Sequence, residues 1–190
     1  MSLALLADAG LPMIFLTFPA MLMLLIPVIV IEGLLCKKWL GLTTAEAMKS
    51  NALSNLASTI IGVPVAWAIM LGVEFLTFGI IERSNAIQNW RSPIAQVIWL
   101  FLGSAWIGPP SEKNVWVIPA ATLVLLVPFF LASYGIEYLV VKHMVGMPEG
   151  GPPNLAYRRV RIAVRNANLI TYGAMFVATS AWLVFSFVRH

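Results

Sequence analysis

Long runs of hydrophobic residues, rather than alternating or amphipathic patterns, dominate this chain. A run of about 20 apolar residues is long enough to cross a bilayer as a helix. Four segments reach that length, at residues 11–35, 53–73, 115–141 and 167–188. The pattern therefore predicts an all-α integral membrane protein with four transmembrane helices.

A shorter apolar segment, residues 93–108, lies between the second and third spans and is bounded by Pro93 and by Pro109-Pro110. Its length falls just below the usual spanning range. We therefore expect a short re-entrant or interfacial helix here, within an outer bridging segment, residues 74–114. Tryptophan favours the headgroup level of a membrane, and four tryptophans fit this placement: Trp90, Trp99, Trp106 and Trp116.

Basic residues gather in two loops, one between the first two spans and one between the last two. Lys and Arg concentrate on the cytoplasmic side of membrane proteins. Four crossings place both loops in the cytoplasm and both termini on the non-cytoplasmic side, which predicts an integral protein of the bacterial inner membrane. The loop residues are Lys37, Lys38 and Lys49 in the first loop, and Lys142, Arg158, Arg159, Arg161 and Arg165 in the second.

The composition agrees with a membrane protein, since 60% of the 190 residues are hydrophobic and 11% are charged. The net charge of +4 comes from residues beside the spans, so it indicates the lipid bilayer and no nucleic acid as a partner. A single cysteine, Cys36, excludes an internal disulfide. Metal, nucleophile and cofactor motifs are missing from the sequence. We therefore expect no cofactor and favour a non-enzymatic function.

Two parts of the chain resemble each other, which predicts one membrane domain, residues 1–190, built from duplicated hairpins at 11–73 and 115–188. The inward turn of each hairpin makes the repeat parallel, with a pseudo-twofold axis along the membrane normal. Chance matching between hydrophobic segments is the alternative. At an offset of 105, Ile31-Glu32, Leu34, Lys37 and Gly41 match Ile136-Glu137, Leu139, Lys142 and Gly146. At an offset of 115, after a ten-residue insertion, Asn51-Ala52 and Ala66-Trp67 match Asn166-Ala167 and Ala181-Trp182.

Glu32 and Glu137 are the sharpest candidate site, because ionisable residues within spans are costly. The lysine five residues after each lies about 140° around the helix, so it is not the natural partner. One hypothesis is a structural clasp to the start of the next helix, where unpaired N–H groups are available. The clasp residues would be Asn51 with Lys49, and Arg165 with Asn166. The competing hypothesis is a proton- or cation-binding pair on the pseudo-twofold axis.

Small and polar residues follow one face of the second span, at a spacing of three to four residues. They favour a packing seam between helices, with a polar lining for a substrate or ion path as the alternative. The main members are Asn51, Asn55, Ser58 and Gly62, with Ser54 and Thr59 alongside. The last span has a weaker counterpart in Asn168, Thr171, Tyr172, Met175 and Thr179.

Two functions fit these observations. The first is a non-catalytic scaffold or accessory subunit of a larger membrane complex, because the polar residues suit helix packing. The second is a small transporter or channel that uses Glu32 and Glu137 as a proton- or cation-binding pair. Either function predicts other membrane subunits or self-association as partners.

Overall fold

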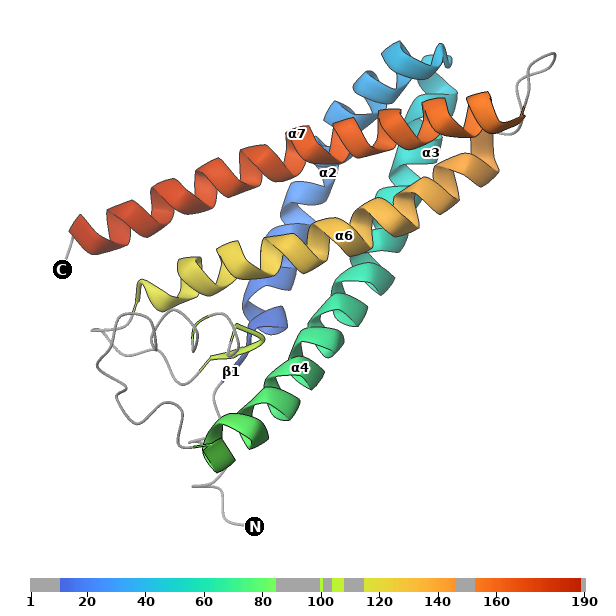
Figure 1. Cartoon of the computed structure of the whole chain (residues 1–190). Helices are drawn as coiled ribbons and strands as arrows, with labels where there is room; N and C mark the ends of the chain where they lie inside the picture. Colours follow the sequence, from blue (N-terminus) through green and yellow to red (C-terminus); the bar gives the residue numbers. More distant parts are fainter. Residues whose placement is uncertain (1–10, 85–99, 101–103, 108–114, 146–152, 189–190) are drawn as a thin grey trace. The chain divides into compact units, whose positions relative to one another are not determined.

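The computed structural model describes residues 11–84, 100, 104–107, 115–145 and 153–188. Long helices dominate these residues, and a pair of two-residue strands completes the secondary structure that they form. The elements are β1 (Leu11–Pro12), α2 (Met13–Leu40), α3 (Thr44–Ala57), the π-helix η1 (Ser58–Gly62), α4 (Val63–Ser84), β2 (Trp106–Ile107), α6 (Val117–Val145) and α7 (Pro153–Val188) (Figure 1).

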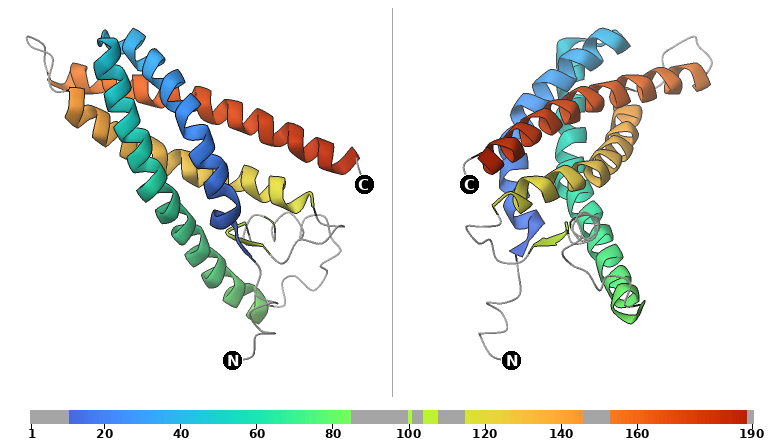
Figure 2. Two further views of the ribbon diagram at one scale, coloured as in Figure 1. Left: turned by 180° about the vertical axis from the view of Figure 1, so that it is seen from behind. Right: turned by 60° about the vertical axis from the view of Figure 1, so that its left-hand side comes forward.

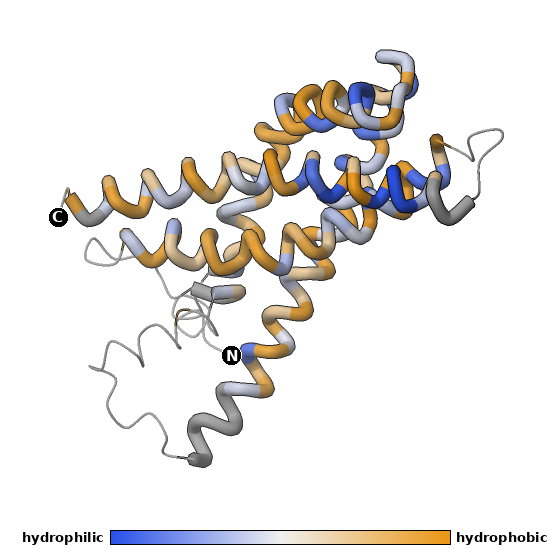
Figure 3. Tube along the Cα trace, turned by 45° about the horizontal axis from the view of Figure 1, so that its top comes forward, coloured by the Kyte–Doolittle hydropathy of each residue, from blue (hydrophilic) through white to orange (hydrophobic). Residues whose placement is uncertain are grey.

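The prediction of four helices able to span a membrane is confirmed. The segments that are long and apolar enough are Thr17–Leu40, Thr44–Thr77, Val117–Val145 and Ala156–Ser186. The second and fourth helices begin well before the predicted spans, at Thr44 and Pro153. Both helices start with polar turns, so the long apolar runs do not predict these turns. Figure 3 shows this for α7, in which hydrophilic positions lie among hydrophobic ones in the half away from the C-terminus.

A tight turn joins α2 to α3. Gly41 has a φ of 71°, the left-handed conformation that favours glycine after a helix, and its N–H donates to the carbonyl of Lys37 at 3.0 Å. Thr43 then begins α3 with a capping box, in which its hydroxyl and backbone N–H bond reciprocally with Glu46. Lys37 Nζ also donates to Thr44 Oγ1 at 2.8 Å. Hydrogen bonds at the end of α2 and at the start of α3 therefore fix the conformation of the turn.

Prolines lie inside two of the long helices without ending them. Pro19 and Pro27 are inside α2, and Pro128 is inside α6. Both helices stay continuous through these positions in the two views of Figure 2. Neighbouring helices and local adjustments let a membrane helix tolerate the lost backbone hydrogen bond.

The chain divides into two compact units, and the first combines Met1–Phe18, Val65–Pro128 and Phe176–His190. Within it, β1 pairs antiparallel with β2, with Leu11 opposite Ile107. The carbonyl of Ala105 accepts from the backbone N–H of Met13 at 3.1 Å and from Trp67 Nε1 at 2.8 Å. Most of the expected interfacial helix, residues 93–108, lies outside the described residues, and Trp106–Ile107 forms strand β2 instead.

The second unit combines Pro19–Pro64 with Phe129–Met175. Its four helical segments come from α2, from α3 with η1, from α6 and from α7. One apolar cluster of this unit joins α6 to α7 through Val141, Val160 and Val164, with Tyr134 and Tyr138 packed against it. Both candidate glutamates and the polar face of α3 belong to this unit.

Candidate functional site

Glu32 and Glu137 are both buried, with only 1% and 2% of their surfaces exposed. Each lies eight residues before the last residue of its helix, Leu40 in α2 and Val145 in α6. At 1.5 Å per residue, both are about 12 Å from the helix end. The two carboxyl groups are therefore placed at matching depths by their helices.

Glu32 accepts hydrogen bonds from two other helices. Asn55 on α3 donates its amide Nδ2 to Glu32 Oε2 at 2.8 Å. Thr171 on α7 donates its hydroxyl Oγ1 to Glu32 Oε1 at 2.6 Å. Glu32 therefore connects α3, the partner in its own hairpin, with a helix from the other hairpin.

Glu137 has the complementary set of partners. Asn168 on α7 donates its amide Nδ2 to Glu137 Oε2 at 2.6 Å. Ser58, the first residue of η1, donates its hydroxyl Oγ to Glu137 Oε1 at 2.9 Å. The four bonds close a ring from α2 to the α3–η1 segment, α6, α7 and back to α2. We call the six residues that make these bonds the carboxyl network: Glu32, Asn55, Ser58, Glu137, Asn168 and Thr171.

The two halves of the carboxyl network match contact by contact. Asn55 and Asn168 each also donate Nδ2 to the carbonyl four residues earlier, at 3.1 and 3.2 Å. Ser58 and Thr171 each also approach the carbonyl three residues earlier, at 3.1 Å in both cases. Each glutamate is thus held by an amide from its own hairpin and by a hydroxyl from the other.

The side chains of the two glutamates also interact with each other. In the described part of the chain, their other hydrogen-bonding partners are amides and hydroxyls, which carry no charge. Two basic side chains of the same unit contact tyrosines instead. Lys142 Nζ lies 4.2 Å from the centre of the Tyr157 ring. Arg161 Nε donates to the Tyr134 hydroxyl at 2.9 Å.

The partners of the glutamates differ from those of the clasp hypothesis. Asn51 donates Nδ2 to the carbonyl of Ala47 at 2.8 Å, and Arg165 donates Nε to Asn166 Oδ1 at 3.3 Å. Because α3 begins at Thr44 and α7 at Pro153, these residues lie inside the helices rather than at their starts. The N–H groups that the clasp requires are therefore already used by the helices.

Side-chain direction explains why Glu32 meets Asn55 rather than Asn51. Side chains in a helix lean toward the N-terminus of their own helix. Glu32 therefore leans away from the turn that joins α2 to α3, whereas a side chain on α3 leans back toward that turn. Glu32 therefore meets Asn55, which lies one helical turn farther along α3 than Asn51.

The polar strip expected on the second span is buried at each of its main positions, Asn51, Asn55, Ser58 and Gly62. Gly62 marks a close approach of η1 to α6, since a Cβ atom there would lie 2.9 Å from Ile136 Cδ1. A π-helical turn often marks a functional site, and here its first residue is the partner of Glu137.

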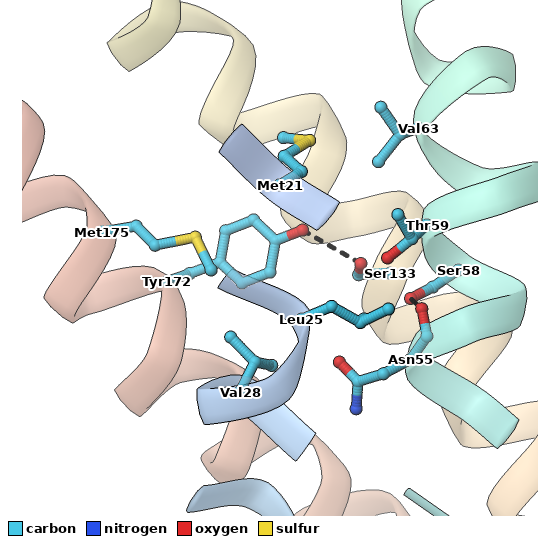
Figure 4. A pocket seen from close by; sticks show the side chains of 10 residues that line it. All are labelled: Met21, Leu25, Val28, Asn55, Ser58, Thr59, Val63, Ser133, Tyr172 and Met175. Atoms are coloured by element: carbon cyan, nitrogen blue, oxygen red, sulfur yellow. Dashed lines mark hydrogen bonds between the residues drawn. The ribbon is translucent and has the colours of Figure 1, made fainter. Parts of the chain in front are cut away.

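A small cavity of about 30 Å³ adjoins the network (Figure 4). Asn55 and Ser58 line it, so the network donors from α3 and η1 border this space. Tyr172 extends into the same region and donates its hydroxyl to Ser133 Oγ at 3.0 Å. The remaining lining residues are Met21, Leu25, Val28, Thr59, Val63 and Met175.

Sequence reasoning missed Ser133 and did not connect Asn168 and Thr171 to the glutamates. A signal for the latter was present, because Asn-x-x-Ser at Asn55–Ser58 recurs as Asn-x-x-Thr at Asn168–Thr171. A second missed signal was the pattern of Thr43 and Glu46, which is typical of a capping box and locates the start of α3. Nothing in the sequence pattern around Ser133 distinguishes it from other small residues of α6.

Comparison of the chain with family models, curated proteins and solved structures finds no match. Four helices are long and apolar enough to span a membrane, which indicates the class of helical integral membrane proteins. Among the described residues, no three His, Cys, Asp or Glu side chains gather into a group that could hold a metal ion. The carboxyl network is therefore the feature of the described residues that bears most directly on function.

Proposed function

We propose that the protein is a small ion-translocating membrane protein whose paired glutamates bind a proton or a single cation. The observation that carries this proposal is the meeting of two buried carboxyl groups whose described partners are all uncharged. Two neighbouring carboxylates repel each other strongly where the dielectric constant is low. The pair therefore needs a positively charged ligand, and ionisable groups within spans commonly mark ion pathways.

The matched contacts support an origin of the two hairpins by duplication. Glu32 and Glu137 are 105 residues apart, whereas Asn55 and Asn168, like Ser58 and Thr171, are 113 apart. This register replaces the offset of 115 expected for the second helices. A parallel duplication places one glutamate from each repeat beside the pseudo-twofold axis, where an ion can be bound between them.

The proposal retains the orientation expected from the charges, with both basic loops in the cytoplasm of a bacterial cell and both termini outside. The network then lies nearer the cytoplasmic face. Because four helices rarely enclose a complete path, we include self-association, and the many exposed apolar side chains of the spans leave surface available for it.

Ion flux into vesicles tests this function. The purified protein is reconstituted in liposomes that contain a pH-sensitive, a sodium-sensitive or a potassium-sensitive dye, and an ion gradient across the liposome membrane drives ion movement. We expect proton or cation flux with the native protein, and flux at the level of empty vesicles for Glu32→Gln and for Glu137→Gln. Glu46→Gln is the matched control, because Glu46 lies outside the network and Gln also completes a capping box.

Folding of the variants decides how a loss of flux is interpreted. Gln has the shape of a protonated Glu, so the variants should elute as single species and unfold at nearly the native temperature. Native protein that gives no flux of protons, sodium or potassium contradicts the proposal. Unaltered flux in both Gln variants contradicts the assigned site.

The same hydrogen bonds also favour a second function, that of a scaffold or accessory subunit. Each of the four carboxyl oxygens already has a donor, and the bonds connect four helical segments. Purification in mild detergent followed by native mass spectrometry tests this alternative. A bound partner, together with loss of assembly in the Gln variants, supports the scaffold. A clean species without a partner counts against it.

A further inference from the structure

The two kinds of donor in the carboxyl network differ in what they can do when a carboxyl group changes its protonation state. An amide N–H only donates, whereas a hydroxyl can both donate and accept. Each glutamate has one partner of each kind. This combination constrains which ion the pair can bind.

The amide donors have a fixed orientation. Asn55 Nδ2 also donates to the carbonyl of Asn51 at 3.1 Å, and Asn168 Nδ2 to the carbonyl of Val164 at 3.2 Å. A backbone carbonyl only accepts, so the NH₂ group, rather than the amide oxygen, must occupy this position. Both amides therefore present hydrogens to the carboxyl groups in every state of the site.

The hydroxyl donors can reverse. Ser58 Oγ lies 2.9 Å from Glu137 Oε1 and 3.1 Å from the carbonyl of Asn55. Thr171 Oγ1 lies 2.6 Å from Glu32 Oε1 and 3.1 Å from the carbonyl of Asn168. A hydroxyl has one hydrogen, so it satisfies one of these acceptors at a time. If the carboxyl oxygen gains a proton, it can donate to the hydroxyl, which then donates to the backbone carbonyl.

We infer that the ion bound by the pair is a proton, and that Ser58 and Thr171 are hydroxyl switches that accommodate its arrival and departure. This inference rests on the proposed ion site and names its ligand. On uptake, a hydronium ion gives a proton to a carboxylate oxygen and leaves as water, and one O–H bond forms as another breaks. The hydroxyl hydrogen turns to the carbonyl three residues earlier, and its own covalent bond stays intact.

The same donors disfavour a metal cation. Sodium, calcium and magnesium require several oxygen atoms with free lone pairs around them. Here an amide N–H group or a hydroxyl group lies against each of the four carboxyl oxygens, at heavy-atom distances between 2.6 and 2.9 Å. A metal ion would have to displace these donors, whereas a proton fits between them.

The cavity beside the network offers a place for the water that such a transfer needs. Its volume of about 30 Å³ is enough for about two water molecules, and a buried water needs several polar neighbours. The side chains of Ser58 and Asn55 provide these on one wall, and Tyr172 with Ser133 on another (Figure 4). Water in this space lies next to the switch of Glu137.

The other titratable groups that interact with the pair are few in the described part of the chain. Cys36 on α2 and Tyr172 on α7 interact electrostatically with both glutamates. The α3–η1 segment contributes amides and hydroxyls, and α6 contributes Glu137 itself. A titration of the pair is therefore separable from other groups by comparison with variants of the glutamates.

Infrared difference spectroscopy on the full chain in lipid nanodiscs tests the inference, because a protonated carboxyl group has its own C=O stretching band. We expect a band that titrates with pH in the native protein and is absent from Glu32→Gln/Glu137→Gln. In Ser58→Ala and in Thr171→Val, the band should move to higher wavenumber because the carboxyl group loses a partner. The midpoint of the titration should rise by about one pH unit, because the charged carboxylate loses a stronger hydrogen bond than the neutral carboxyl group does.

Conservative variants separate a switch from a merely structural contact. Ser58→Thr and Thr171→Ser keep the hydroxyl, so each should restore the native band and midpoint. Thr122→Val is the matched control, because the hydroxyl of Thr122 bonds within α6, to the carbonyl of Ile118 at 2.8 Å. It should leave the band and midpoint unchanged.

Each contrary result has a distinct meaning. A missing band at every pH, or a band that Ser58→Ala and Thr171→Val leave unaltered, overturns the inference. A midpoint that moves with sodium or calcium concentration shows a metal cation as the ligand, which overturns the inference and leaves the proposed ion site standing. A titrating band without flux in vesicles supports the proton site and contradicts transport.

Discussion

The two halves of the carboxyl network make the same bonds with different surroundings. The hydroxyl partner of Glu137, Ser58, is in a π-helical turn, whereas Thr171, the partner of Glu32, is within the regular helix α7. The cavity is lined by the α3–η1 donors, Asn55 and Ser58. In contrast, the amide oxygen of Asn168 is buried and has no hydrogen-bonding partner among the described residues.

This difference places one donor of each glutamate, both from the α3–η1 segment, beside a space in which water fits. The bonds that hold the carboxyl groups are matched, so both can bind a proton with the same chemistry. Of the four network donors, the two on the α3–η1 segment line the cavity in which water fits, and this segment includes the irregular helical turn. Three pairs of substitutions test the comparison, in order of decreasing expected effect.

The largest effect should come from Gly62→Val, which fills the close approach of η1 to α6. Its Cβ would lie 2.9 Å from Ile136 Cδ1, and 3.6 Å from Ala132 Cβ. Overpacking of this kind should lower the free energy of unfolding by about 2 kcal/mol. Gly173→Val on α7 is the matched substitution, because a Cβ there would meet no heavy atom of another described element within 4 Å. Unfolding of both variants in mixed detergent micelles measures the difference, and equal losses would contradict a special close approach at η1.

A smaller effect should separate the two amides. Asn55→Leu removes a donor from Glu32 and should reduce the free energy of unfolding by about 1 to 2 kcal/mol. Asn168→Leu removes the equivalent donor from Glu137 but also removes the unpartnered amide oxygen. Asn168→Leu should therefore reduce the free energy of unfolding by about 1 kcal/mol less than Asn55→Leu does. The same unfolding measurement compares the two, and a larger loss in Asn168→Leu would show that the amide oxygen has a favourable role.

The smallest effect should separate the two hydroxyls. Ser58→Ala should cost about 0.5 kcal/mol, because water from the adjacent cavity can replace the lost donor. Thr171 is not among the residues that line the cavity, so water from the cavity does not replace its hydroxyl. Thr171→Val should therefore lower the free energy of unfolding by about 1 kcal/mol. Thermal unfolding in detergent checks the order. A reversed order would argue against water in the cavity.

Much of this architecture could be predicted from the chain. The four apolar runs predicted the helices, because spanning length and hydrophobicity are local properties of a sequence. Glu32 and Glu137 were conspicuous as carboxyl groups within such runs, and the spacing of Asn55 and Ser58 placed them on one helix face. The capping-box pattern of Thr43 and Glu46 also indicates where α3 starts, a boundary that the apolar run alone did not predict.

The sequence by itself thus determined the class of protein, the helices and the residues with unusual chemistry, since each depends on composition and short-range periodicity. Only the tertiary structure decided which side chains meet. Asn168 and Thr171 reach Glu137 and Glu32 because four helical segments pack together and their side chains lean along them in opposite directions. The contact between Glu32 and Thr171 joins residues 139 positions apart, and no local pattern specifies the partner at that distance.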